Sequence, residues 1–209
     1  MDLKQFIRNI PDFPKEGILF RDITTLLKSN EAFNYALEAL YNQIVDKNIT
    51  KVVAIESRGF IFGSLLAHKL NAGFIPIRKP NKLPAEKLSQ EYALEYGTDK
   101  IEIHKDAISP NDNVLLHDDL LATGGTMLAA CKLIENLGGN IKQISFLIEL
   151  EALKGRELLN KYTVSSVIKY WENKLTIFPK ISEINLNYDL YNYFDITDIS
   201  FYFYSPNTK

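Results

Sequence analysis

The side chains best suited to chemistry in this chain gather between residues 114 and 126, in the segment VLLHDDLLATGGT. A short apolar run leads to two adjacent carboxylates, Asp118 and Asp119, and the small-residue loop ATGGT follows almost at once. The backbone N–H groups of such a loop, and of a helix that begins after it, bind phosphate well. Carboxylates accept hydrogen bonds from ribose hydroxyls. The segment therefore predicts a binding site for a sugar phosphate.

A parallel sheet is predicted to position this segment. Buried strands are predicted at 51–55, 73–77, 114–116, 144–150 and 164–168. Helices are predicted after a cap at Ser29 or Asn30, over 59–70 and over 127–137. The apolar side of the helix over 59–70 is expected to carry Phe60, Leu65, Leu66 and Leu70. The alternation indicates an α/β fold, a mostly parallel twisted sheet with helices on both faces.

Two polar segments are expected to meet at one edge of that sheet. ESRG follows the strand at 51–55, and DDLLATGGT follows the strand at 114–116. Because ligands bind beyond the carboxyl ends of parallel strands, both segments should line one cleft. Residues 79–106, here called the flap, interrupt the alternation with a lysine-rich stretch and two alternating runs, 92–96 and 100–104, separated by Gly97. This pattern predicts an inserted hairpin that serves as a lid.

Composition bounds the class of protein. The 209 residues are 46% hydrophobic and carry a net charge of −2, so no bulk positive charge favours nucleic-acid binding. Cys131 is the one cysteine, which excludes an internal disulfide framework. No signal peptide or membrane-spanning run is evident, and a cytoplasmic location is expected. Residues 1–172 are predicted to form the main domain, and the aromatic-rich residues 173–209 an ordered, β-rich C-terminal extension.

Several segments together resemble the type I phosphoribosyltransferase family, and within it the adenine phosphoribosyltransferases. The acidic pair with ATGGT is similar to the family's signature for phosphoribosyl pyrophosphate (PRPP). Further similar segments occur in the same order and at similar spacing: IRNIPDFP (7–14), GILFRDIT (17–24), ESRGF (56–60), RK (78–79), KLP (82–84), LEYG (94–97) and LKGRE (153–157). Each is weak alone, but the ordered set is specific and covers about residues 3–172.

The resemblance implies that adenine and PRPP react to give AMP and pyrophosphate. Positive charge then develops on the ribose ring while pyrophosphate departs. The residues that the resemblance assigns to PRPP are Ser57, Arg58, Arg78, Lys79, Lys82, Tyr96, Asp118, Asp119, Ala122, Thr123, Gly124, Gly125 and Thr126. Asp118 and Asp119 would also support Mg²⁺, directly or through water. A homodimer is the family expectation.

The same resemblance assigns the base and the proton chemistry. Phe20 would stack on adenine, backbone groups of Leu19 and Arg21 would read its edge, and Leu150 would line the opposite wall. Glu95 would act as general acid or base toward a ring nitrogen, with Arg58 as the second catalytic residue on the pyrophosphate side.

Two other functions stay open at this stage. The chain could use another base, such as hypoxanthine, xanthine or orotate, or it could be a non-catalytic PRPP-binding regulator. The segments FRDIT and LEYG favour adenine, and the presence of Arg58, Lys82 and Glu95 speaks against a regulator. His117 stands where the family usually has an apolar residue, and we interpret it as a packed core or interface residue.

Overall fold

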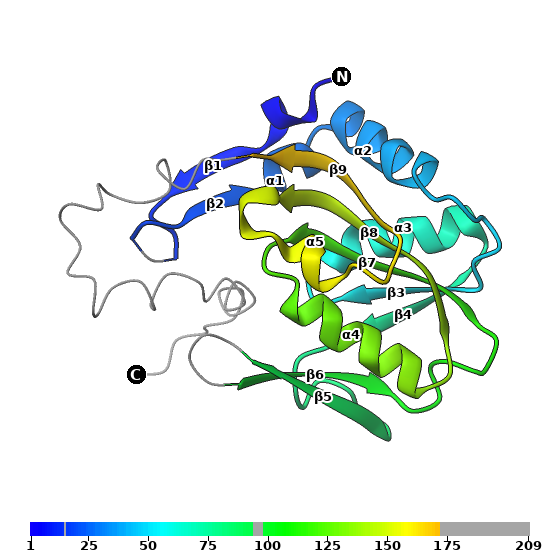
Figure 1. Ribbon diagram of the computed structural model, residues 1–209. Coiled ribbons are helices and arrows are strands. Elements are labelled where there is room, and N and C mark those ends of the chain that lie inside the picture. Colours follow the sequence, from blue (N-terminus) through cyan, green and yellow to red (C-terminus); the bar gives the residue numbers. More distant parts are fainter. Residues whose placement is uncertain (15, 94–97, 172–209) are drawn as a thin grey trace, which may run out of the picture.

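A five-stranded parallel sheet forms the centre of the computed structural model, which describes residues 1–14, 16–93 and 98–171 (Figure 1). Its strands are β3 (Lys51–Ile55), β4 (Gly73–Ile77), β7 (Asn113–Leu121), β8 (Asn140–Leu150) and β9 (Val164–Tyr170). They lie in the order β4-β3-β7-β8-β9, each parallel to its neighbours. The predicted parallel α/β fold is confirmed, and β7 and β8 are longer than the sequence indicated.

Helices cover both faces of this sheet, as predicted. Helices α2 (Asn30–Asn42) and α3 (Gly59–Leu70) pack on one face, and α4 (Gly125–Asn136) packs on the other (Figure 1). Ser29 caps α2 by accepting a hydrogen bond from the backbone N–H of Ala32. Successive strand residues point to opposite faces, so Val52 joins the core under α2 and α3 while Val53 joins the core under α4.

The buried stripe of α3 differs from the predicted one. Gly59, Phe62, Gly63, Leu66 and Ala67 are its buried residues, at i, i+3, i+4, i+7 and i+8. A side chain at Gly63 would come within 2.6 Å of the Ala54 Cβ atom, so the glycine lets α3 lie directly on β3. The prediction holds for Leu66, which is buried, and for Leu70, which packs against the core. It was wrong for Phe60 and Leu65, which are half-buried, because small residues make the closest contact.

An N-terminal hairpin that the sequence reading did not predict lies at one end of the sheet. Strands β1 (Arg8–Pro11) and β2 (Leu19–Asp22) pair antiparallel, and their register places Ile10 opposite Phe20. The remaining short elements are η1 (Leu3–Phe6), α1 (Thr24–Leu27), η2 (Glu151–Leu153) and α5 (Gly155–Leu158). The hairpin lies near the carboxyl ends of the sheet strands, which face left in Figure 1.

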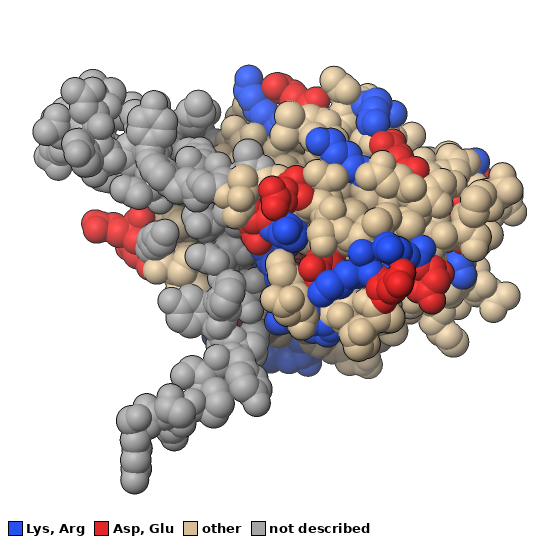
Figure 2. Space-filling view, turned by 90° about the horizontal axis from the view of Figure 1, so that it is seen from below, with Lys and Arg blue, Asp and Glu red and all other residues tan. Residues whose placement is uncertain are grey.

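The flap contains the predicted hairpin, with a longer first strand. Strand β5 (Lys87–Ala93) begins five residues before the predicted 92, and it pairs antiparallel with β6 (Thr98–His104). Residues 94–97 lie outside the described part of the chain, as does the predicted extension over 173–209. Figure 2 views the molecule from the side of this hairpin and shows acidic and basic side chains next to one another. The flap lysines are thus largely paired, as in Lys87–Glu102 at 2.8 Å and Lys105–Glu86 at 3.1 Å.

The helices can also be compared with the thickness of a bilayer. None of the helices in the described part of the chain is long and apolar enough to cross a membrane.

Candidate active site

The loop ATGGT joins β7 to the start of α4, as the sequence predicted. Gly124 has φ of 86°, a left-handed conformation that favours glycine, and a side chain there would meet the Gly155 carbonyl oxygen at 2.7 Å. No side chain caps α4. The first N–H groups of a helix have no acceptor within the helix, so those of Gly125 and Thr126 are oriented to bind an anion. The loop has the backbone geometry of a phosphate site.

Asp118 and Asp119 lie in β7, and two leucines separate them from this loop. Asp119 is buried, and its Oδ2 lies 2.9 Å from Nε of Arg58. Asp118 is partly exposed, and its Oδ1 accepts the Asp119 backbone N–H at 2.8 Å. Removal from water, together with the neighbouring Asp119 carboxylate, raises the pKa of Asp118 well above its ordinary value. The two acids therefore differ: Asp119 anchors an arginine, while Asp118 can face a ligand.

The loop after β3 brings a second set of polar groups to the same edge. It contains a cis peptide bond between Glu56 and Ser57, and Ser57 is exposed. A side chain at Gly59 would lie 2.9 Å from Oδ1 of Asp118, so this loop lies against β7. Strands β3 and β7 are adjacent, with Ala54 opposite His117. The predicted convergence of ESRG and DDLLATGGT at one edge is what the fold produces.

Glu56 organises the cationic residues around that loop. Its buried carboxylate accepts hydrogen bonds from Nε and Nη2 of Arg78 at 3.2 and 3.1 Å and from Nζ of Lys82 at 2.9 Å. It also accepts the Lys79 backbone N–H at 2.9 Å. Three residues that the sequence assigned to PRPP are thus gathered by one acid that the sequence reading gave no role. Glu56 therefore holds these cationic residues in place in the absence of a ligand.

The Lys79 side chain points away from Glu56, toward the flap hairpin. Its Nζ atom forms an ion pair with Asp99 and lies 3.2 Å from the Tyr92 hydroxyl. Lys79 therefore connects the end of β4 with β5 and β6. The sequence predicted Lys79 as a PRPP ligand and did not foresee this second set of contacts.

The N-terminal hairpin supplies the predicted base side of the cleft. Leu19 and Phe20 are half-buried, and the guanidinium carbon of Arg58 lies 5.1 Å from the centre of the Phe20 ring. The Arg21 side chain is buried instead, 3.8 Å over the Tyr170 ring, with Nη1 bonded to Asn9 at 2.5 Å. The Arg21 backbone carbonyl oxygen lies 3.5 Å from Nη1 of Arg58, on the side of the pyrophosphate loop predicted from ESRG.

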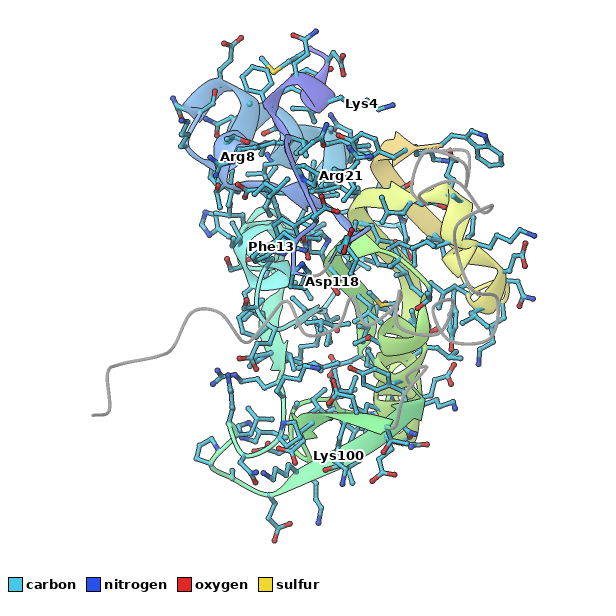
Figure 3. The ribbon with its side chains drawn as sticks, turned by 90° about the vertical axis from the view of Figure 1, so that its left-hand side faces the viewer. Lys4, Arg8, Phe13, Arg21, Lys100 and Asp118 are labelled. Carbon is cyan, nitrogen blue, oxygen red and sulfur yellow. The ribbon has the colours of Figure 1, made fainter. Side chains whose placement is uncertain are left out.

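Figure 3 looks onto the carboxyl edge of the sheet and shows how these parts surround Asp118. Phe13 and Arg21 lie on one side of it, and Lys100 of the flap hairpin lies on the other. Leu150 ends β8 and is half-buried, as a pocket wall would be. Glu95 and Tyr96, which the sequence assigned to catalysis and to PRPP, lie outside the described residues.

Comparison with known proteins identifies the family. The family model for the phosphoribosyl transferase domain matches residues 24–177 of this sequence. An adenine phosphoribosyltransferase of Halothermothrix orenii is 60% identical over 169 residues, which make up 81% of this chain and 99% of that protein. The chain belongs to the adenine phosphoribosyltransferase family.

Solved adenine phosphoribosyltransferases share the fold described above. The enzyme of Thermoanaerobacter pseudethanolicus is 53% identical, with a TM-score of 0.79 over 81% of this chain and 98% of that one. The enzyme of Saccharomyces cerevisiae is 40% identical, with a TM-score of 0.75 over 79% of this chain and 96% of that one. The yeast structure is a complex with D-2,5-dideoxy-2,5-imino-altritol 1,6-bisphosphate and adenine.

In this adenine phosphoribosyltransferase, four residues that contact predicted site residues were not themselves predicted from the sequence. They are Glu56, Tyr92, Asp99 and Tyr170. Glu56 is the first residue of the ESRGF segment, so the sequence did contain a signal for its role. The other three act through partners far along the chain, and no local pattern indicates such pairs.

Proposed function

We propose that the chain transfers the 5-phosphoribosyl group from PRPP to adenine, giving AMP and pyrophosphate in purine salvage. The observation that carries this proposal is the position of the acidic pair. Asp118 and Asp119 lie between the phosphate loop, the Glu56–Gly59 loop and the Phe20 hairpin. A ribose held there has its 5′-phosphate, its pyrophosphate and the base each beside a suitable partner.

The 5′-phosphate belongs at the loop of residues 122–126. Backbone N–H groups at the start of α4 and the hydroxyls of Thr123 and Thr126 would hold its oxygens. Thr123 is exposed at the loop surface, where a ligand can reach it. The Asp118 carboxylate would accept hydrogen bonds from the ribose 2′ and 3′ hydroxyls.

Pyrophosphate leaves with the electron pair of the C1′–O bond, and its charge must be stabilised as that bond breaks. Arg58, Arg78 and Lys82 supply positive charge around the exposed Ser57. Glu56 keeps Arg78 and Lys82 in place before the substrate arrives, which lowers the cost of ordering them during the reaction. The Lys79 side chain is farther from this group because it pairs with Asp99, so its positive charge acts from a greater distance.

The purine belongs on the side of the N-terminal hairpin. Phe20 would stack on it and Leu150 would pack on the other side, while backbone groups of Leu19 and Arg21 would distinguish an amino group from a carbonyl. The new bond forms between a ring nitrogen and C1′, and that nitrogen's proton must leave. We assign the removal of this proton to Glu95, and we assign to Tyr96 a contact with PRPP that closes the site.

Mg²⁺ fits the residues present. Magnesium binds through one or two carboxylates together with substrate phosphates, and Asp118 and Asp119 are two carboxylates beside the proposed phosphate positions. When bound, the ion would neutralise part of the pyrophosphate charge. Because Asp119 already pairs with Arg58, Asp118 is the better direct or water-mediated ligand.

We also propose residues 1–172 as the catalytic domain, residues 173–209 as an extension to it, a cytoplasmic location and a homodimer. Light scattering of the full chain tests the last of these. Comparison of the full chain with a 1–172 truncation tests the first, since adenine turnover should survive the truncation.

The activity is tested by incubating the protein with PRPP, Mg²⁺ and one base at a time. Chromatography then measures AMP against the nucleotides formed from hypoxanthine, xanthine and orotate. We expect AMP as the main product. Good turnover of another base without turnover of adenine would overturn the specificity, and PRPP binding without any turnover would favour a regulator.

A further inference from the structure

The Tyr92 hydroxyl lies where three parts of the cleft meet, although the proposed chemistry gives it no role. Tyr92 belongs to β5 of the flap hairpin and is 8% exposed. Its hydroxyl donates to Oδ2 of Asp99 on β6 at 2.8 Å. It accepts from Nζ of Lys79, which follows the end of β4, at 3.2 Å. The Thr126 side chain, at the start of α4, is also close enough to this hydroxyl to act on its pKa, in the direction that lowers it.

These contacts satisfy the phenol both as a donor and as an acceptor. A tyrosine hydroxyl has one proton to donate and two lone pairs to accept with. Asp99 takes the proton, and Lys79 donates to the hydroxyl oxygen. Burial raises the pKa of Tyr92, so the phenol stays protonated and remains a donor. A buried network in which every group is satisfied fixes one geometry.

The partners of Tyr92 extend to both ends of PRPP. Lys79 is anchored at its backbone N–H by Glu56, the acid that also holds Arg78 and Lys82. Thr126 belongs to the loop proposed for the 5′-phosphate. Asp99 is itself fixed, since its Oδ1 accepts the Lys100 backbone N–H at 2.7 Å. The path therefore runs from the pyrophosphate side through the flap hairpin to the 5′-phosphate side.

We propose that Tyr92 is a positioning residue for PRPP, which sets the distance between the phosphate loop and the cationic pyrophosphate side. The proposal rests on the proposed function. The described contacts of the hydroxyl include no residue of the N-terminal hairpin, where adenine is placed. Loss of the hydroxyl should thus affect PRPP far more than adenine.

Tyr92→Phe in the full chain tests this proposal, because it removes the hydroxyl and keeps the ring. We expect KM for PRPP to rise about tenfold, as loss of a charge-assisted hydrogen bond predicts, while KM for adenine stays within about twofold. Tyr162→Phe is the matched control. Its hydroxyl also donates to a carboxylate, Glu135 at 2.8 Å, but no residue of the proposed PRPP site takes part. The control should behave as wild type.

A double-mutant cycle separates positioning from general damage. Thr126→Val and Tyr92→Phe should be less than additive in their effect on kcat/KM for PRPP, because neighbouring side chains that position one ligand are energetically coupled. Asp99→Asn, which weakens the acceptor and keeps its shape, should raise KM for PRPP in the same direction even if Tyr92→Phe fails to fold. Wild-type kinetics in Tyr92→Phe, equal losses for both substrates, or full additivity would each overturn the proposal. If the wild-type chain forms no AMP, it is the proposed function that has failed.

Discussion

Arg58 and Asp119 join two neighbouring strands at the carboxyl edge of the sheet. Nε of Arg58, in the loop after β3, lies 2.9 Å from Oδ2 of Asp119 on β7. A guanidinium has five N–H donors, and Nη1 of the same side chain lies 3.5 Å from the Arg21 carbonyl oxygen. Arg58 thus contacts Asp119 and also lies beside the proposed base side. Pairing through Nε fixes the plane of the guanidinium, while its Nη atoms can reach other acceptors.

Arg58→Ala should therefore impair the use of PRPP. It removes one cation from the pyrophosphate side and leaves the buried Asp119 carboxylate without its ion-pair partner. We expect KM for PRPP and Kd for pyrophosphate to rise about 10–100-fold, the range for a charge-assisted hydrogen bond. Initial velocities and calorimetric titration with pyrophosphate measure the two quantities.

Two further variants sharpen this test. Arg58→Lys keeps the charge but not the planar fork, so it should restore only part of the affinity. Lys69→Ala removes the 2.7 Å ion pair with Glu38 on the outer helices and should leave both constants unchanged. Wild-type values in Arg58→Ala would place the pyrophosphate elsewhere.

Glu95→Ala should lower kcat far more than it changes the affinity for PRPP. A positioned general acid or base contributes roughly 10²–10⁴-fold, so we expect a fall in kcat of at least about 10²-fold. The matched control is Glu91→Ala, which removes another glutamate of the flap. Glu91 is an exposed partner of Lys100 at 3.2 Å, so kcat should not change. An unaltered kcat in Glu95→Ala would remove that residue from the mechanism.

Local sequence patterns predicted the elements that depend on neighbouring residues. The strand at 51–55, the Ser29 cap and the turn into α4 all follow from residues within a few positions of one another. The phosphate loop and ESRG could be placed together because parallel strands end at one edge. The structure adds the strand order, which makes β3 and β7 neighbours and so brings the two segments together.

Contacts between distant residues could not be predicted in this way. The Arg21 side chain packs on Tyr170, which lies on the edge strand β9, and Lys79 pairs with Asp99 across the flap. Nothing in the periodicity near either residue indicates its partner. The buried side of α3 was also difficult to predict. Gly59 and Gly63 make its closest contacts because they lack a side chain, whereas the prediction relied on large apolar residues.

His117 should make the stability of the protein sensitive to acid. It is completely buried, with Nδ1 3.3 Å from the Ser145 hydroxyl, and burial lowers its pKa to about 4. An unfolded histidine titrates near about 6.5. The unfolded chain therefore takes up a proton that the folded chain does not between these values. The contribution of His117 to the free energy of unfolding is fully present above about pH 6.5 and is lost as the pH falls toward 4.

His117→Val should remove this acid sensitivity. At pH 5 the wild type loses about 2 kcal/mol from this group, or about 4–8 °C in Tm. The drop in Tm between pH 7.5 and pH 5 should shrink by that amount in the variant, whatever its Tm at pH 7.5. His68→Val, the same change at an exposed position of α3, should keep the wild-type drop. Equal drops in all three proteins would contradict the assignment.

Arg156 should be needed for the stability of the wall behind the phosphate loop. Its guanidinium donates to both carboxylate oxygens of the buried Glu149, at 2.9 and 2.5 Å, and to the Val164 carbonyl oxygen at 2.8 Å. The adjacent Gly155 packs so closely that a side chain there would come within 2.1 Å of the Ala122 carbonyl oxygen. Arg156 thus ties α5 to the sheet at the point where α5 supports the loop.

Arg156→Met should lower the free energy of unfolding by about 3 kcal/mol, because it leaves the Glu149 charge buried without its main partner. That corresponds to a fall in Tm of about 6–12 °C. Lys161→Met is the control, since it breaks the exposed 3.1 Å pair with Glu135 and should cost at most about 1 kcal/mol. Glu149→Gln added to Arg156→Met should recover part of the loss by removing the stranded charge. Thermal unfolding of the four proteins decides the point: equal Tm values for Arg156→Met and Lys161→Met would mean that water, rather than Arg156, neutralises Glu149.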